Sequence, residues 1–129
     1  MMNLTKTLLA AAVPFLLAAA AYADSGPLAT PPLATEGGGQ VTCDIVNAGN
    51  QAREVTIQVL LGSSTTPPLD ERTLVLAPGD AAELLVIDQC SNGGCGLYYC
   101  QFTVQGPKHA YRAALCVKDV AGKVCLPAV

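Results

Sequence analysis

Six cysteines are the residues of this chain with the clearest chemistry, and their even number predicts disulfide bonds. They are Cys43, Cys90, Cys95, Cys100, Cys116 and Cys125. Even cysteine sets are typical of small exported domains, where the environment is oxidising. The spacing of Cys90, Cys95 and Cys100 lacks the CxxC pairs common in zinc sites. Paired cysteines also carry no thiolate, so we expect neither a metal centre nor a cysteine nucleophile.

The positions of the cysteines narrow the ways in which they can pair. Cys43 and Cys100 fall on the apolar side of alternating segments, so a bond between them would tie two sheets together. Cys116 and Cys125 flank a turn near residues 120 and 121, and Cys90 and Cys95 close a tight, glycine-rich loop. We therefore expect three bonds: Cys43–Cys100, Cys116–Cys125 and Cys90–Cys95. The first should stabilise the fold most, because it closes the longest loop.

His109 is the only histidine of the chain. A serine–histidine–aspartate site needs an acid to orient the imidazole, and the nearest acid along the chain is Asp119. The run Gly62-Ser63-Ser64-Thr65 lacks the second glycine of a nucleophile elbow. A blue-copper site needs two histidines, and the sequence contains no Asp-x-Asp-x-Asp calcium loop. We therefore predict a protein without catalytic residues, metal ions or cofactors, and a hydrolase is the least favoured function.

The first 23 residues have the pattern of a secretory signal peptide. Lys6 is their only charge, and an uncharged run rich in Leu and Ala follows it. The run ends at Ala21-Tyr22-Ala23, small residues of the kind a signal peptidase reads, and we expect cleavage after Ala23. A membrane anchor is disfavoured, because the run is shorter than the roughly 20 residues of a spanning helix and contains Pro14. The sequence therefore predicts export to the periplasm or beyond.

The remainder, residues 24–129, is one acidic domain preceded by an arm. Of seven basic residues, Lys6 belongs to the leader, which leaves six against ten acidic residues and a net charge of −4. Nucleic acid is an improbable partner for such a surface, because its affinity comes from Lys and Arg. Residues 24–39 are rich in Pro and then Gly, which predicts a flexible arm. The alternatives are a spacer or a strand donated to a partner.

Residues 40–129 alternate between apolar and polar side chains in short segments separated by turn residues. This pattern predicts an all-β fold, an immunoglobulin-like antiparallel β-sandwich of about seven strands, stapled by disulfides. The run Ala77-Pro78-Gly79-Asp80 predicts a type II turn. Residues 80–85 and 110–117 could instead form helices, but we favour strands for both. The expected strands are residues 41–46, 55–61, 73–76, 82–87, 98–104, 111–118 and 124–126.

Several of these segments resemble known bacterial proteins. The runs at residues 43–47, 76–79, 99–104 and 112–117 resemble a group of small exported bacterial proteins without an assigned activity, over roughly residues 40–126. The turns Asn47-Ala48-Gly49-Asn50 and Leu76-Ala77-Pro78-Gly79-Asp80 are similar to those of CARDB-type domains. These domains are immunoglobulin-like bacterial modules linked to cell-surface adhesion. The resemblance implies a β-sandwich and supplies no catalytic residue.

An exposed tyrosine beside a closed loop is the one recognition feature of the sequence. Neighbours on a strand face opposite ways, so we expect Tyr98 in the core and Tyr99 at the surface. With Ser91, Asn92, Gly93 and Gly94, Tyr99 could form a recognition surface. We predict a non-catalytic binding or interaction module for an unknown envelope protein or glycan. The alternative is a fimbria-like structural subunit that uses the arm at residues 24–39.

Overall fold

The period-two pattern of the sequence corresponds to strands, of which the described part of the chain contains nine. The computed structural model describes residues 26–35, 39–62, 67–87, 96–120 and 122–129. A single turn of 3₁₀-helix, η1 (Lys108–Ala110), precedes the eighth strand. The strands are β1 (Gly26–Ala29), β2 (Leu33–Ala34), β3 (Gln40–Asn47), β4 (Arg53–Leu61), β5 (Asp70–Leu76), β6 (Ala81–Ile87), β7 (Leu97–Val104), β8 (Tyr111–Asp119) and β9 (Gly122–Pro127).

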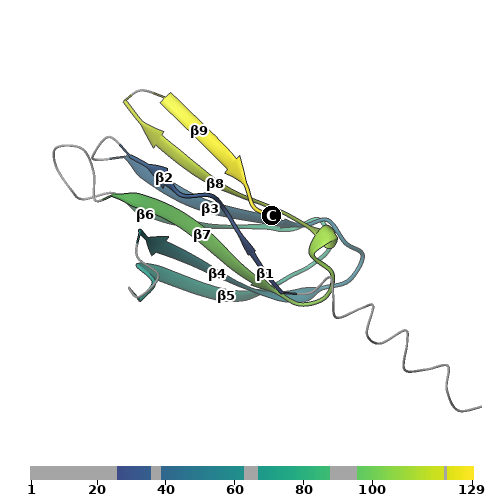
Figure 1. Ribbon diagram of the computed structural model, residues 1–129. Coiled ribbons are helices and arrows are strands. Elements are labelled where there is room, and N and C mark those ends of the chain that lie inside the picture. Colours follow the sequence, from purple (N-terminus) through teal and green to yellow (C-terminus); the bar gives the residue numbers. More distant parts are fainter. Residues whose placement is uncertain (1–25, 36–38, 63–66, 88–95, 121) are drawn as a thin grey trace, which may run out of the picture.

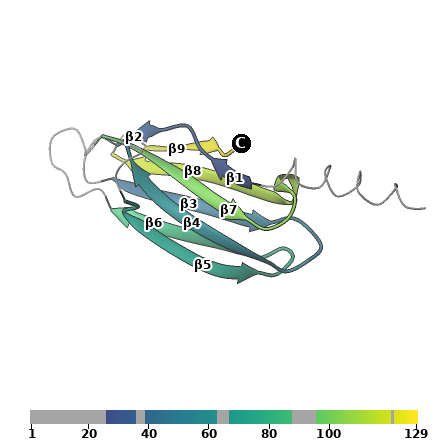
Figure 2. The ribbon, with the colours of Figure 1, turned by 60° about the horizontal axis from the view of Figure 1, so that its bottom comes forward.

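The strands form two antiparallel sheets packed face to face, as Figures 1 and 2 show. One sheet has the order β1-β7-β4-β5, with β2 also paired to β7, and the other has the order β6-β3-β8-β9. In immunoglobulin domains strand B lies beside E and strand C beside F. The pairs β3–β6 and β4–β7 reproduce this centre. The flanks differ, because β8 lies beside β3 and β1 beside β7, where immunoglobulin domains have strands A and G.

The core is the set of inward side chains that the alternation predicts. On β3, Val41, Cys43 and Ile45 are completely buried, and their neighbours along the strand are more exposed. The inward positions of β4 and β7 are buried in the same way, and Tyr98 lies in the core as predicted. Burial of these apolar groups supplies the main driving force for folding.

Two disulfides lie within the described residues, and both are predicted pairs. Cys43–Cys100 joins β3 to β7 across the core, with its Cα atoms 5.7 Å apart and both residues fully buried. Cys116–Cys125 joins directly opposite residues of β8 and β9. The proposed Cys90–Cys95 pair falls outside the described residues.

The two segments whose sequence pattern also allowed a helix form strands. Ala81–Ile87 is β6, and Tyr111–Asp119 is β8. The turn before β6 has the predicted geometry: Gly79 has φ +84° and the Asp80 amide donates to the Ala77 carbonyl at 3.0 Å. The tight turn reverses the chain after β5, so β6 can pair with β3 of the second sheet immediately. This favours a strand over a helix at this position.

The arm predicted for residues 24–39 is wrong for residues 26–35, which are built into the first sheet. Gly26–Ala29 and Leu33–Ala34 pair with β7, and Leu28 is only 6% exposed. The prolines suggested poor packing because proline cannot donate to a ladder. Instead, Pro31 and Pro32 lie between the two short strands, and Pro27 lies within β1 opposite Thr103.

Asn47, predicted only as a turn residue, is a completely buried hub at one end of the sandwich. Its Nδ2 donates to the carbonyls of Gln51 and Leu76 at 2.8 and 2.9 Å, and its Oδ1 accepts from the Gly49 amide at 3.0 Å. The backbone amide of Asn47 donates to the Asp80 carbonyl, and its carbonyl accepts from the Gly79 amide. One side chain therefore joins the β3–β4 loop to the end of β5.

Replacing Asn47 with Ala should lower the free energy of unfolding by about 2 to 3 kcal/mol. The change leaves the buried Leu76 carbonyl and the partly buried Gly49 amide without these partners, and each unsatisfied group is costly. Urea denaturation would measure the effect. Asn50→Ala is the matched control, because Asn50 is exposed in the same loop and should change stability by less than about 0.5 kcal/mol. Equal effects of the two changes would contradict the assigned role of Asn47.

The two described disulfides should differ in their contribution to stability. Cys43–Cys100 spans 57 residues and Cys116–Cys125 spans 9. Loop-closure entropy then gives about 4 kcal/mol for the first and about 2.5 kcal/mol for the second. Double replacement of each pair by Ala, followed by guanidinium denaturation, should show this order. A larger loss from the Cys116–Cys125 pair would contradict it.

Candidate recognition surfaces

The outer side of the first sheet carries two rows of polar side chains that cross three strands. Gln58 on β4 lies directly opposite Gln101 on β7 and Glu71 on β5. Thr56, two residues earlier on β4, lies in the same way opposite Thr103 and Thr73. With Tyr99 on β7, these side chains form what we call the polar face: Thr56, Gln58, Glu71, Thr73, Tyr99, Gln101 and Thr103.

Hydrogen bonds within the polar face hold some of its side chains in place. Gln58 Nε2 donates to Glu71 Oε2 at 2.8 Å. The hydroxyl oxygens of Thr56 and Thr73 lie 2.9 Å apart in a hydrogen bond. Cross-strand pairs of this kind stabilise a sheet by a few tenths of a kcal/mol to about 1 kcal/mol. They also preorient amide and hydroxyl groups that still have hydrogen-bonding capacity toward solvent.

Tyr99 lies at the apolar end of the polar face. It is half-buried and directly opposite Leu60, which points outward but is only 8% exposed. Tyr99 therefore offers an aromatic surface next to the amide of Gln101, two residues along β7. Of the predicted recognition residues, only Tyr99 can be placed, because Ser91, Asn92, Gly93 and Gly94 lie outside the described residues. The sequence did not indicate Gln58 and Glu71, because only the strand register places Gln58 beside Gln101 of β7 and Glu71 beside Gln58.

The outer side of the second sheet has a different chemistry, with charges of both signs around a shallow hollow. The hollow is about 210 Å³ and is lined by Thr42, Glu83, Lys118 and Lys123 among others. Asp44 on β3 lies directly opposite Glu83 on β6. Burial, and then the nearby Glu83 carboxylate, raise the pKa of Asp44 above its ordinary value of 3.8, while Lys123 partly opposes this. The half-buried carboxylate of Asp44 thus lies beside the exposed carboxylate of Glu83.

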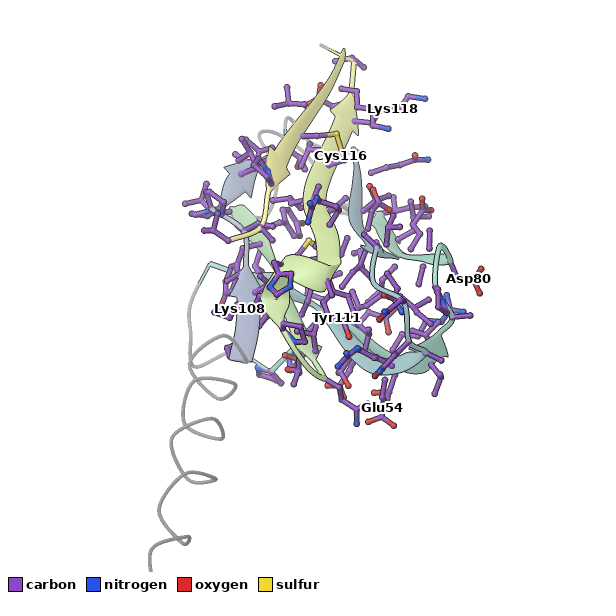
Figure 3. The ribbon with its side chains drawn as sticks, turned by 90° about the vertical axis from the view of Figure 1, so that its right-hand side faces the viewer. Glu54, Asp80, Lys108, Tyr111, Cys116 and Lys118 are labelled. Carbon is purple, nitrogen blue, oxygen red and sulfur yellow. A yellow bond between two sulfur atoms is a disulfide. The ribbon has the colours of Figure 1, made fainter. Side chains whose placement is uncertain are left out.

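A second hollow lies at the end of the sandwich near η1, and it carries basic side chains. Figure 3 shows Lys108 and Tyr111 at this end, and Cys116 and Lys118 toward the other end of β8. The hollow is about 550 Å³, and its lining includes Lys108, His109 and Arg112 together with apolar groups from β1 and the last residues of the chain. Arg112 Nη1 donates to the carbonyls of His109 and Tyr111 at 3.0 and 2.9 Å. Part of its guanidinium is therefore committed to the η1 backbone.

The residues weighed for hydrolysis lie far apart. His109 is exposed in η1, whereas Asp119 ends β8, so the nine-residue strand lies between them. At about 3.3 Å per residue that strand is roughly 30 Å long. His109 and Asp119 therefore cannot form one catalytic pair. Among the residues that the structure describes, no group of three His, Cys, Asp or Glu side chains could hold a metal ion.

Within the described part of the chain, no helix is both long and apolar enough to cross a bilayer. The predicted leader, residues 1–23, lies outside that part.

Comparison with known proteins supports the fold alone. No protein-family model matches the chain, and a search of curated proteins finds no match. The crystal structure of Thermotoga maritima 1070 is similar, with a TM-score of 0.55 and 14% sequence identity. The similarity covers 81% of this chain and 93% of that chain. The similarity therefore extends over nearly the whole of that protein, and it supports the overall fold.

The raised pKa of Asp44 predicts that the contribution of this residue to the free energy of unfolding falls as the pH rises above 3.8. A raised pKa means that the folded state holds the proton more tightly than the unfolded state, so ionisation at higher pH favours unfolding. Asp44→Asn should therefore raise the melting temperature at pH 7 and leave it unchanged at pH 3. Thermal unfolding across this range would test the effect.

Asp80→Asn is the matched control for this measurement. Asp80 is exposed in the turn before β6, and Figure 3 shows its side chain at the edge of the domain. The control should not reproduce the gain in melting temperature. A loss of stability in Asp44→Asn at pH 7 would contradict the assignment.

Proposed function

We propose that this chain is an exported, non-catalytic binding module, and that it binds a neutral glycan of the cell envelope on the polar face. The observation that carries the proposal is the pair of amide and hydroxyl rows with Tyr99 at their end. The chemistry of the polar face, its charge and the setting of the domain all support this function.

The chemistry of the polar face suits sugar hydroxyl groups. Gln58 and Gln101 each present donors and an acceptor, and the threonine hydroxyls can do both. Sugar hydroxyls likewise donate and accept, so neighbouring hydroxyls of one ring can bond to opposite amides. Tyr99 adds an aromatic surface with a polar tip, which suits the apolar side of a sugar ring. Together these groups match a ligand that is polar at its rim and apolar on its face.

The charge of the polar face favours a neutral ligand. Its only ionisable group apart from the tyrosine is Glu71, and Glu54 lies farther along β4. A ligand with phosphate or carboxylate groups would meet this negative charge without a neighbouring Lys or Arg in the rows. A protein partner is also less suited, because binding energy between proteins centres on buried Trp, Tyr and Arg anchors. Tyr99 is the one such residue on the polar face.

The setting of the domain agrees with a role outside the cytoplasm. Residues 1–23 predict a signal peptide, and the structure contains the Cys43–Cys100 and Cys116–Cys125 bonds. Disulfides of this kind persist in the periplasm and beyond. A rigid, covalently tied sandwich that presents one polar sheet surface is suited to binding in that environment.

Loss of the aromatic surface should weaken glycan binding. Neutral and anionic oligosaccharides on an array would identify the ligand, and titration calorimetry would measure its dissociation constant. Tyr99→Ala should raise the dissociation constant about tenfold, because an aromatic contact contributes about 1.4 kcal/mol. Gln101→Ala should raise it about fivefold through the lost hydrogen bonds.

The matched control is Gln40→Ala, which removes an exposed glutamine from the outer side of the other sheet. It should leave the dissociation constant unchanged. Circular dichroism would verify that each variant is folded. If only anionic glycans bound, or if Tyr99→Ala bound as tightly as the unaltered protein, the proposal would be wrong.

A further inference from the structure

The outer side of the second sheet carries a disulfide as well as charged side chains. Cys116 on β8 lies directly opposite Thr42 on β3, whose neighbours Val41 and Cys43 are completely buried in the core. Cys116 therefore points away from the core, toward the hollow of about 210 Å³ that it lines together with Thr42. Cys125, opposite Cys116 on β9, completes the bond on the same outer side. This disulfide thus joins two neighbouring strands of one sheet at the surface.

The two described disulfides differ in the access that a thiol has to them. Both cysteines of the Cys43–Cys100 bond are 0% exposed, so a thiol in solution cannot reach them while the domain is folded. In the other bond Cys116 is 6% exposed, but Cys125 is an exposed residue of the edge strand β9. Thiol–disulfide exchange requires direct attack of a thiolate on one of the two sulfur atoms. Of these four residues, Cys125 is therefore the one open to attack in the native fold.

Two lysines lie next to the surface disulfide on the same side of the sheet. Lys118 follows Cys116 by two residues on β8, Lys123 precedes Cys125 by two residues on β9, and the two lysines are opposite each other in the register. Side chains two residues apart on a strand share a face, and both lysines line the same hollow as Cys116. Figure 3 shows Lys118 near Cys116, with Lys108 toward the other end of the domain.

Positive charges at this place favour both parts of an exchange reaction. They attract the attacking thiolate, and they stabilise the thiolate that leaves. The charged side chains that line the hollow are Lys118, Lys123 and Glu83, so the positive charges outnumber the negative one. Glu83 is also on β6, which β3 separates from the strands of the bond. The surface disulfide therefore combines an accessible sulfur with cations on both of its strands.

We propose that the Cys116–Cys125 bond is a site of reversible thiol–disulfide exchange with a protein dithiol outside the cytoplasm, while Cys43–Cys100 stays closed. A thiolate of the dithiol attacks Sγ of Cys125 and forms a mixed disulfide, and the sulfur of Cys116 leaves as a thiolate that takes up a proton. The second thiolate of the partner then displaces the Cys125 thiolate, which is protonated in turn. The partner thus loses two electrons and becomes a disulfide, and this chain gains two thiols. The same steps in reverse, with the oxidised partner, restore the bond.

Reduction should loosen β9 without unfolding the domain. β9 is the last strand of its sheet, and within the described residues it pairs with β8 alone. Opening the bond removes the covalent tie between these two strands and leaves the Cys43–Cys100 bond across the core in place. Amide hydrogen exchange should therefore become faster in β9 and stay unchanged in β3 and β7.

Partial reduction of the folded, oxidised protein tests the proposal. Dithiothreitol without denaturant, followed by iodoacetamide, should alkylate Cys116 and Cys125 while Cys43–Cys100 stays linked. Trypsin separates residues 113–118 from residues 124–129, so peptide mass spectrometry assigns each of the two alkylated cysteines. Reduced thioredoxin, used as a protein dithiol in place of dithiothreitol, should give the same product. Equal rates of opening for the two bonds, or a surface bond that thioredoxin leaves closed, would overturn the proposal.

A second measurement tests the part that the lysines play. The double variant Lys118→Gln/Lys123→Gln should slow the opening of the surface bond by dithiothreitol about threefold, because a less stabilised thiolate leaves more slowly. Lys108→Gln is the matched control, since Lys108 lies in η1, away from the bond, and it should leave the rate unchanged. Circular dichroism would verify that both variants are folded. An unchanged rate in the double variant would contradict the role of the lysines, and a domain that unfolds when the surface bond alone is opened would contradict the reversible exchange.

Discussion

The bond between Cys43 and Cys100 is the constraint on which the rest of the structure depends. It joins the central strands of the two sheets, and both of its residues are fully buried. A strand has a period of two, so fixing Cys100 inward also fixes Tyr98 and Phe102 inward and sends Tyr99 and Gln101 outward. A shift of one residue would reverse every one of these positions. The polar face therefore exists because a covalent bond in the core selects the orientation of β7.

Much of this architecture could be predicted, because its signals are local. The alternation around Cys43 and Cys100 identifies the inward residues directly, and the same alternation distinguishes β8 from a helix. Pro78 and Gly79 specify the turn before β6 by their own backbone preferences. Two of the cysteine pairs could be deduced because each depends on one strand face or one hairpin. Predictions succeed where a residue's own type, or its neighbour's, decides the conformation.

The parts that could not be predicted depend on contacts between distant residues. Thr30 lies 70 residues from Cys100 in sequence, so nothing local indicates that its hydroxyl completes the β7 ladder. Asn47 has the composition of a turn residue, yet its amide holds the Leu76 carbonyl 29 residues away. The approach of Asp44 to Glu83 and of Gln58 to Glu71 follows from strand register. Register depends on all the strands together, and a single segment does not contain it.

Strand β7 is the element on which the core, the polar face and the sheet edge meet. Its inward side holds Cys100, its outward side presents Tyr99 and Gln101, and its edge pairs with β1 and β2. Pro27 and Ala29 of β1 lie opposite Thr103 and Gln101, so this edge borders the polar rows without adding a charged side chain to them. The disulfide in the core, the polar side chains outside it and the pairing at the edge therefore all depend on one orientation of β7.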